Sequence, residues 1–176
     1  NDNVSFDIKK GEVFALVGEN GAGKSTLMNI LYGINTPTSG EVYIRGERMV
    51  KHTPAESIEH GIGMVHQHFM LVPSFTVAQN IVLSREPRKN KIFYDLKAAE
   101  KKVKEIGDRY GFAINPSKKI YEMSVSEKQT VEIIRVLYRG ANILILDEPT
   151  AVLTPQETQK LFKVLRRMRD DGKAIV

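Results

Sequence analysis

Nine consecutive residues have the types and spacing of a phosphate-binding loop. Residues 18–26 fit the pattern G-x-x-x-x-G-K-[ST], with an extra glycine at position 21. Glycines permit backbone conformations in which successive amide N–H groups curl around a phosphate. Lys24 can then reach the β- and γ-phosphates, and the Ser25 hydroxyl can bind the Mg²⁺ that accompanies them. The residues predicted to bind nucleotide are Gly18, Glu19, Asn20, Gly21, Ala22, Gly23, Lys24, Ser25 and Thr26.

The segments on either side of this loop support the same interpretation. Residues 13–17 form an apolar run that predicts a strand, and residues 27–32 have the character of a helix. A strand before the loop and a helix after it are the context that the motif requires. The helix would add the partial positive charge of its N-terminus to the phosphate site. The sequence therefore predicts that this chain binds a nucleoside triphosphate.

Two acids follow a second apolar run. Ile143–Leu146 is uniformly apolar, as expected of a strand that is buried on both faces, and Asp147 and Glu148 come directly after it. In open α/β sheets, ligands bind outside the carboxyl ends of the strands. Asp147 is placed to support Mg²⁺, and Glu148 to accept a proton from water that attacks the γ-phosphate. The alternative is a polar exit from a core strand, and the phosphate loop upstream favours the catalytic interpretation.

Strands and helices alternate along the rest of the chain. We expect strands at residues 4–8, 13–17, 41–45, 62–65, 143–146 and 174–176. We expect helices after the capping residues Thr53, Asp95 and Thr154 and over residues 125–138, with residues 73–94 irregular. Tyr43 and Phe69 are expected to be core aromatics. This alternation indicates an α/β fold with a mostly parallel central sheet.

Composition narrows the class of protein further. At 176 residues the chain is about one domain, and it has no cysteine, which excludes disulfides and thiolate metal sites. The net charge is +5, but the lysines and arginines are spread along the chain and mixed with acidic residues. This distribution favours a solvated charged surface over a nucleic-acid-binding patch. His66 and His68 could share a metal, but no third ligand lies near them in sequence, so ordinary polar roles are favoured. Both ends look cut, because residues 174–176 resemble the start of a buried strand, and we expect a fragment of a longer protein.

A third motif completes a family pattern. Residues 124–129 read Ser-Val-Ser-Glu-Lys-Gln and precede the acidic strand end by about two dozen residues. With the phosphate loop and the Leu-Asp-Glu-Pro-Thr sequence, this order resembles the nucleotide-binding domain of ATP-binding cassette (ABC) transporters over essentially the whole chain. The resemblance implies a P-loop NTPase core, an N-terminal antiparallel β part and an inserted helical subdomain at about 68–130. Residues 1–176 would be a single, truncated ABC ATPase domain.

The resemblance also implies roles for individual residues. Glu148 and Gln67 would be catalytic, and Gln67 would share Mg²⁺ with Ser25 and Asp147 while facing a membrane partner. The signature segment, Ser124, Val125, Ser126 and Glu127, would contact ATP bound to the opposite domain. In this chain Ser126 stands where the second signature glycine belongs, Glu127 replaces a glutamine, and Thr154 replaces an aspartate. Ser124 and Glu127 also fit the pattern of a helix capping box. The segment can cap a helix and act as a signature segment at the same time.

The amino-acid sequence of residues 137–157 resembles that of the ATPases of simple-sugar and nucleoside importers. Such proteins hydrolyse ATP with Mg²⁺ at the cytoplasmic face of the membrane, as peripheral subunits. Their partners would be transmembrane permease subunits, a second ABC domain fused on the same chain and, indirectly, a solute-binding protein, with no nucleic acid. We expect the isolated fragment to be weakly active.

Two alternatives stay open at this point. The first is a soluble ABC-type ATPase that acts on ribosomes or DNA. Repair and chromosome members usually carry coiled coils or zinc motifs, and the sequence has neither heptads nor cysteines. The second is a P-loop kinase, which leaves residues 124–129 without an explanation.

Overall fold

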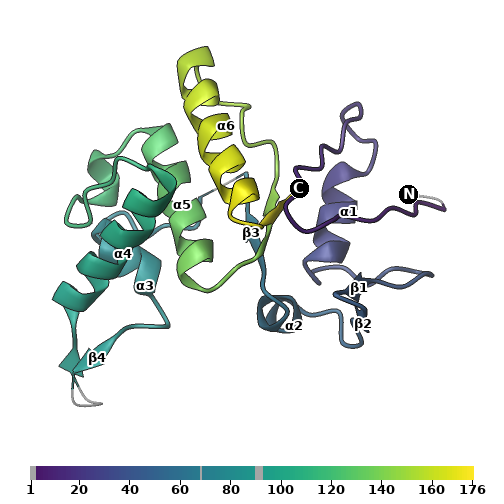
Figure 1. Cartoon of the computed structure of the whole chain (residues 1–176), viewed down its shortest axis with the longest axis horizontal. Helices are drawn as coiled ribbons and strands as arrows, with labels where there is room; N and C mark the ends of the chain where they lie inside the picture. Colours follow the sequence, from purple (N-terminus) through teal and green to yellow (C-terminus); the bar gives the residue numbers. More distant parts are fainter. Residues whose placement is uncertain (1–2, 68, 90–92) are drawn as a thin grey trace.

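A three-stranded parallel sheet lies at the centre of the molecule. The computed structural model describes residues 3–67, 69–89 and 93–176. The strands β3 (Ile62–Val65), β6 (Ile143–Leu146) and β7 (Ala174–Ile175) lie in the order β3-β6-β7, with Ile62 opposite Ile143. All three lie where the sequence predicts strands. Figure 1 shows helices on both sides of this sheet.

The two faces of the sheet pack against two separate apolar cores. Met64 and Ile145 join the core that contains Met28 of α1 (Lys24–Leu31). Leu144 and Leu146 join the larger core of the helical side. Because successive side chains of a strand point to opposite faces, both faces must be apolar here, which accounts for the uniformly apolar run at β6.

A small antiparallel hairpin supplies the N-terminal β part. Its strands are β1 (Tyr43–Ile44) and β2 (Glu47–Arg48), and Arg45 and Gly46 turn the chain with φ of 54° and 83°. Tyr43 is 57% exposed, so the expectation that it is a core aromatic was wrong. Its hydroxyl donates instead to Glu41.

The helix α2 (Pro54–Glu59) begins where the sequence predicts. Thr53 Oγ1 accepts from the amide of Glu56, as an N-cap should. The Glu56 carboxylate accepts from the amides of Val50 and Lys51, so it joins the exit of the hairpin to the start of the helix. These bonds lower the pKa of Glu56, the bond from Val50 most of all.

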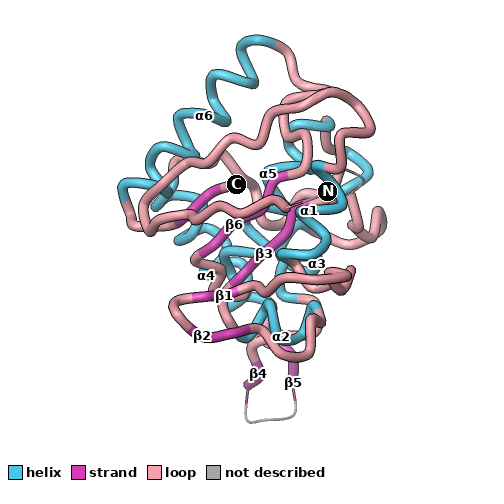
Figure 2. The backbone as a smooth tube through the Cα atoms, turned by 90° about the vertical axis from the view of Figure 1, so that its right-hand side faces the viewer, coloured by secondary structure: helices cyan, strands magenta, loops and turns pink. Residues whose placement is uncertain are grey.

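Most remaining helices form one layer on the far side of the sheet, at the left of Figure 1. The elements of this layer are α3 (Val77–Val82), α4 (Leu96–Tyr110), the 3₁₀ helix η1 (Ile120–Glu122) and α5 (Val125–Tyr138). Their shared core includes Ile81, Val103 and Ile133, which are fully buried. The helix α6 (Pro155–Asp170) lies between this layer and β7. The antiparallel pair of β4 (Arg88–Lys89) and β5 (Phe93–Tyr94) projects from the helical layer. Figure 2 shows that pair at one end of the molecule.

The expectation that residues 73–94 are irregular was wrong. They contain α3 and, in β4 and β5, a short antiparallel pair. The helix begins in a capping box, because Thr76 Oγ1 accepts from the amide of Gln79 and the Gln79 side chain accepts from the amide of Thr76. This Thr-x-x-Gln signal was present in the sequence, between Pro73 and Pro87.

The two expected N-terminal strands are also largely missing. Among the described residues, the stretch 4–8 pairs with no strand, and Phe6 stacks on Phe14 with ring centroids 5.1 Å apart. In the stretch 13–17 only Val13 bridges to Ile175, supported by a bond of 2.8 Å from the amide of Phe14 to the carbonyl of Ile175. A segment with an apolar strand pattern forms a strand only where a neighbouring strand supplies hydrogen bonds to its backbone. Within the described part of the chain, no helix is long and apolar enough to span a bilayer.

Candidate functional site

The phosphate loop passes directly into the first turn of α1. Gly21 and Gly23 have φ of 83° and 88°, in the left-handed region that favours glycine, and Gly23 is the N-cap of α1. Lys24 Nζ donates to the carbonyl oxygens of Gly18 at 2.7 Å and Glu19 at 2.9 Å. The loop therefore holds an ammonium group next to the N-terminus of a helix, which is an arrangement suited to phosphate.

Ser25 and Asp147 come together from distant parts of the chain. Ser25 Oγ lies 3.4 Å from Asp147 Oδ1, although 122 residues separate them. Ser25 is in the first turn of α1, and Asp147 directly follows β6, where its amide bonds to the carbonyl of Val65 at 3.2 Å. Hydroxyl and carboxylate oxygens are ligands that Mg²⁺ prefers. Two of the three predicted metal ligands are therefore neighbours.

The donor set fits Mg²⁺ bound together with phosphates. Among the described residues, no three histidine, cysteine or acidic side chains gather to hold a metal by themselves. Mg²⁺ is commonly held by one or two protein oxygens plus the phosphates of the substrate, which matches the Ser25–Asp147 pair. His66 packs edge-on against Tyr32, with ring centroids 6.1 Å apart. The hypothesis of a shared metal between His66 and His68 cannot be followed, because His68 lies outside the described residues.

Gln67 and Glu148 form a second pair beside the first. Gln67 Nε2 donates to Glu148 Oε2 at 3.4 Å. Glu148 has φ of 47°, which is uncommon for a residue with a side chain and is a strain typical of functional sites. The amide of Ala151 bonds back to the Glu148 carbonyl, so a tight turn follows the strand. Both side chains are exposed, so the carboxylate is accessible to water.

Buried polar side chains of α5 anchor the segments on both sides of this pair. Gln129 is 7% exposed and its Nε2 donates to the carbonyl of Pro149 at 2.7 Å. Glu132 is 2% exposed and accepts from the amide of Met70 at 2.9 Å, while Arg135 pairs with its other oxygen at 2.5 Å. These bonds fix the chain just after Gln67 and just after Glu148. The sequence assigned no such role to the three residues, and their only signal was a polar side chain within a largely apolar helix.

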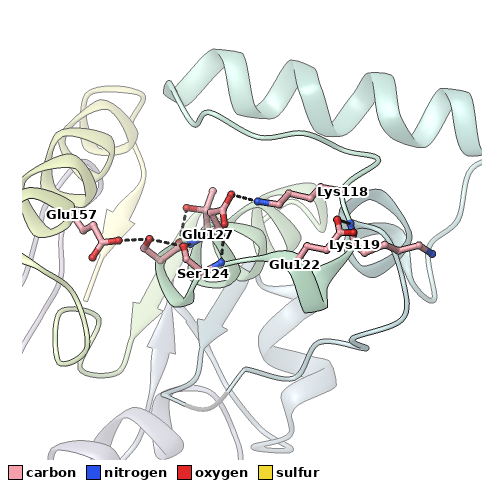
Figure 3. Close-up of polar contacts among 8 residues, drawn as sticks. Lys118, Lys119, Glu122, Ser124, Glu127 and Glu157 are labelled. Atoms are coloured by element: carbon pink, nitrogen blue, oxygen red, sulfur yellow. Dashed lines mark hydrogen bonds and ion pairs between the residues drawn. The ribbon is translucent and has the colours of Figure 1, made fainter.

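The signature segment lies at the start of α5 and is capped as the sequence predicts. Ser124 Oγ accepts from the amide of Glu127 at 3.3 Å, and Glu127 accepts from the amide of Ser124 at 2.8 Å. The other oxygen of Glu127 accepts from Lys118 Nζ at 2.7 Å, and this bond is the main reason that the pKa of Glu127 is lowered. Figure 3 shows this pair beside Ser124. Val125 is 45% exposed.

Within the described residues, no side-chain hydrogen bond joins the signature segment to the phosphate loop. In the described part, the side-chain hydrogen bonds of Ser124, Ser126 and Glu127 lead to one another, to Lys118 and to Glu157. The phosphate loop, the Ser25–Asp147 pair and the Gln67–Glu148 pair form one group, and the signature segment forms another. This separation is what two half-sites for different nucleotides would require.

A phosphate loop at the start of α1, with a metal pair and an acid at the end of the central parallel strand, defines a P-loop nucleotide-binding domain of the cassette type. The chain belongs to the ABC transporter family, whose model matches residues 1–151.

Several curated relatives are named as importer subunits. The chain is 52% identical to a guanosine import ATP-binding protein of Bacillus subtilis (strain 168), over all of this chain and 34% of that protein. It is 52% identical to a nucleoside import ATP-binding protein of Lactococcus lactis subsp. cremoris, over all of this chain and 35% of that protein. A ribose import ATP-binding protein of Streptomyces avermitilis is 44% identical over 99% of this chain and 33% of its own length. The chain thus spans about a third of the length of these relatives.

Solved structures agree with the fold. The ADP conformation of an ATP-binding cassette of an ABC transporter is 25% identical and has a TM-score of 0.84, covering 98% of this chain and 71% of that one. The dimeric structure of a bacterial ABC transporter cassette is 28% identical and has a TM-score of 0.80, covering 99% of this chain and 77% of that one. The P-loop α/β fold predicted from the sequence is confirmed.

Proposed function

We propose that this chain is the ATP-binding and ATP-hydrolysing domain of a subunit that powers a membrane importer of nucleosides or simple sugars. The observation that carries the proposal is the meeting of the Ser25–Asp147 and Gln67–Glu148 pairs at the end of β6. Relatives named for guanosine and nucleoside import are 52% identical, and one named for ribose import is 44% identical. These identities favour nucleosides as the transported solute.

In the proposed mechanism, each group of the site has one task. Lys24 and the loop amides bind the β- and γ-phosphates, because they present positive charge and N–H donors to the same small volume. Ser25, Asp147 and Gln67 would hold Mg²⁺, which would neutralise phosphate charge when bound. Glu148 takes the proton of the attacking water as its general base. The Gln67 amide orients that carboxylate, because it donates a hydrogen bond to it.

The proposed partners are based on the relatives named for import and on their length, of which this chain covers about a third. We propose that a second ABC domain on the same polypeptide supplies the opposite half of each ATP site, through a segment equivalent to residues 124–127. The helical subdomain at about 68–130 would face transmembrane permease subunits, so Gln67 would sense both the permease and the nucleotide. A solute-binding protein would act through the permease. The protein would then lie as a peripheral subunit at the cytoplasmic face of the membrane.

Reconstitution tests this function directly. The full-length protein and its permease would be placed in lipid vesicles, with ATP on the side of the ATPase and the solute-binding protein with labelled guanosine or ribose on the other. The proposal expects uptake that requires ATP and is faster for guanosine. ATP hydrolysis that never drives uptake of either solute would contradict it, and the same preparation tested for binding to ribosomes or DNA would examine the soluble alternative.

A further inference from the structure

The hydroxyl groups of the signature segment connect to an acid of α6. Ser126 Oγ donates to Glu157 Oε1 at 2.5 Å, and Ser124 Oγ lies 3.2 Å from Ser126 Oγ. Glu157 is in the first turn of α6, 31 residues beyond Ser126. Figure 3 shows Glu157 reaching toward Ser124 from one side, with Glu127 and Lys118 on the other. The starts of two helices are therefore joined through the two serines.

The Glu157 carboxylate, at the end of this series of hydrogen bonds, determines which hydroxyl donates in each bond. Each hydroxyl has one proton, and an ionised carboxylate only accepts, so the proton of Ser126 is committed to Glu157. The proton between the two hydroxyls then comes from Ser124, whose oxygen accepts from the amide of Glu127. Both hydroxyl protons consequently point along the hydrogen bonds toward Glu157.

The carboxylate at the end of these hydrogen bonds is ionised and firmly held. Its second oxygen accepts from the amide of Thr154 at 2.9 Å and from Thr154 Oγ1 at 3.0 Å. The bond from Ser126, followed by those from Thr154, lowers the pKa of Glu157. The capping box of Thr154 is what holds Glu157 at this place.

We propose that Glu157 is a positioning residue that competes with the γ-phosphate of the opposite domain's ATP for the hydroxyl protons of Ser124 and Ser126. This inference rests on the proposed function, in which the signature segment contacts that phosphate. Phosphate oxygens accept hydrogen bonds and cannot donate them, so contact with ATP requires a serine to release its proton from Glu157 or from the neighbouring serine. Glu157 therefore weakens ATP binding at the site that this segment completes.

The variant Glu157→Gln separates this role from helix capping. Glutamine serves in a capping box as glutamate does, so the start of α6 should be retained. It removes the charge, and its amide can donate to Ser126 Oγ, which frees the serine proton. In the full-length protein assembled with its permease, the KM for ATP should fall by about 3–10-fold, the scale of one net hydrogen bond. The change should appear in KM rather than in kcat, as a ground-state effect does.

Two matched variants complete the test. Glu122→Gln removes another acid beside the segment, one that accepts from the amide of Lys119, and should leave the KM unchanged. In a Ser126→Gly background the hydrogen bonds are interrupted, so Glu157→Gln should change the KM less than about twofold, since the two positions are then uncoupled.

Two outcomes would overturn the inference. One is a KM that does not fall in Glu157→Gln. The other is an equal fall in the KM with and without the Ser126→Gly substitution, which would show a general charge effect. Failure of the proposed function is distinguishable from both, because it would leave the unmodified assembled protein without ATP-driven uptake of solute.

Discussion

Gln67 Nε2 lies 3.4 Å from Glu148 Oε2, although 81 residues separate the two side chains. The pair joins the segment after β3 to the segment after β6, the two neighbouring strands of the central sheet. Any movement of the segment that carries Gln67 would therefore reach the acid that we assign as the general base. Under the proposed function, this contact would be the physical route from a permease to the chemistry of ATP.

The first prediction concerns that contact. Gln67→Ala removes the donor that orients Glu148, so kcat for ATP hydrolysis should fall by on the order of 10-fold while ATP binding is retained. Steady-state hydrolysis and equilibrium binding of labelled ATP would measure the two effects. Gln159→Ala, which removes an exposed glutamine of α6, is the matched control. An equal loss of activity in both variants would argue against a specific role for Gln67.

The second prediction concerns Mg²⁺. Asp147→Asn keeps the size of the side chain and removes its charge, so the Mg²⁺ concentration for half-maximal hydrolysis should rise by roughly 10-fold or more. Excess Mg²⁺ should restore much of the rate. A titration with MgCl₂ at fixed ATP would measure this shift. If the variant has an unchanged Mg²⁺ requirement, Asp147 does not take part in the metal site.

The third prediction concerns the buried ion pair of α5. Glu132→Ala leaves the amide of Met70 without its acceptor and the Arg135 guanidinium without its counter-ion, so the free energy of unfolding should fall by about 3–5 kcal/mol. The control is Asp170→Ala, which breaks an exposed pair with Arg169 and should cost about 0–1 kcal/mol. Urea unfolding of the full-length variants would compare them, and similar costs at the two sites would refute the buried anchor.

The fourth prediction is a pH dependence at the contact between α4 and α6. Tyr110 donates to Asp171, and burial, followed by this hydrogen bond, raises the pKa of Tyr110 from 10.0 to about 12. A raised pKa in the folded state gives stability that is present below pH 10 and is lost as the pH rises through about 12. Tyr110→Phe should therefore be less stable at neutral pH and lose less stability between these values. Urea unfolding at a series of alkaline pH values would measure this, and parallel profiles for the variant and the unmodified protein would contradict it.

The pKa of Asp171, the acid in the same contact, is shifted in the opposite direction. Asp171 accepts from Tyr110 and from Arg109, and these bonds lower its pKa from 3.8. A lowered pKa gives stability that is present above the unfolded value and is lost as the pH falls through the folded value. Asp171→Asn should remove part of the acid-induced loss, measured by thermal unfolding across the acid range. An unchanged acid profile would show that this carboxylate does not contribute.

Local patterns in the sequence predicted the parts of the site that local chemistry determines. The phosphate loop, the apolar β6 and the acids after it are each contiguous, so their residue types alone identify them. The capping residues Asp95, Ser124 and Thr154 likewise predicted the starts of α4, α5 and α6. The Gln67–Glu148 contact had no such signal, because it depends on how the strands β3 and β6 pair.

Tertiary partners explain what the sequence did not predict. Gln129 and Glu132 are polar residues of a helix, and they are buried because Pro149 and Met70 supply backbone partners. The run at residues 13–17 has the composition of a strand, yet its described ladder is a single bridge at Val13. Polar burial and strand pairing both depend on distant groups, which a local pattern does not contain.

The most direct test of the central claim is Glu148→Gln in the full-length protein reconstituted with its permease. The variant keeps the shape of the side chain and removes the base. We expect ATP binding to be retained, single-turnover hydrolysis at this site to fall by on the order of 10²–10⁴-fold, and ATP-driven solute uptake to be lost with it. Single-turnover hydrolysis and uptake at the unmodified rate would contradict the account.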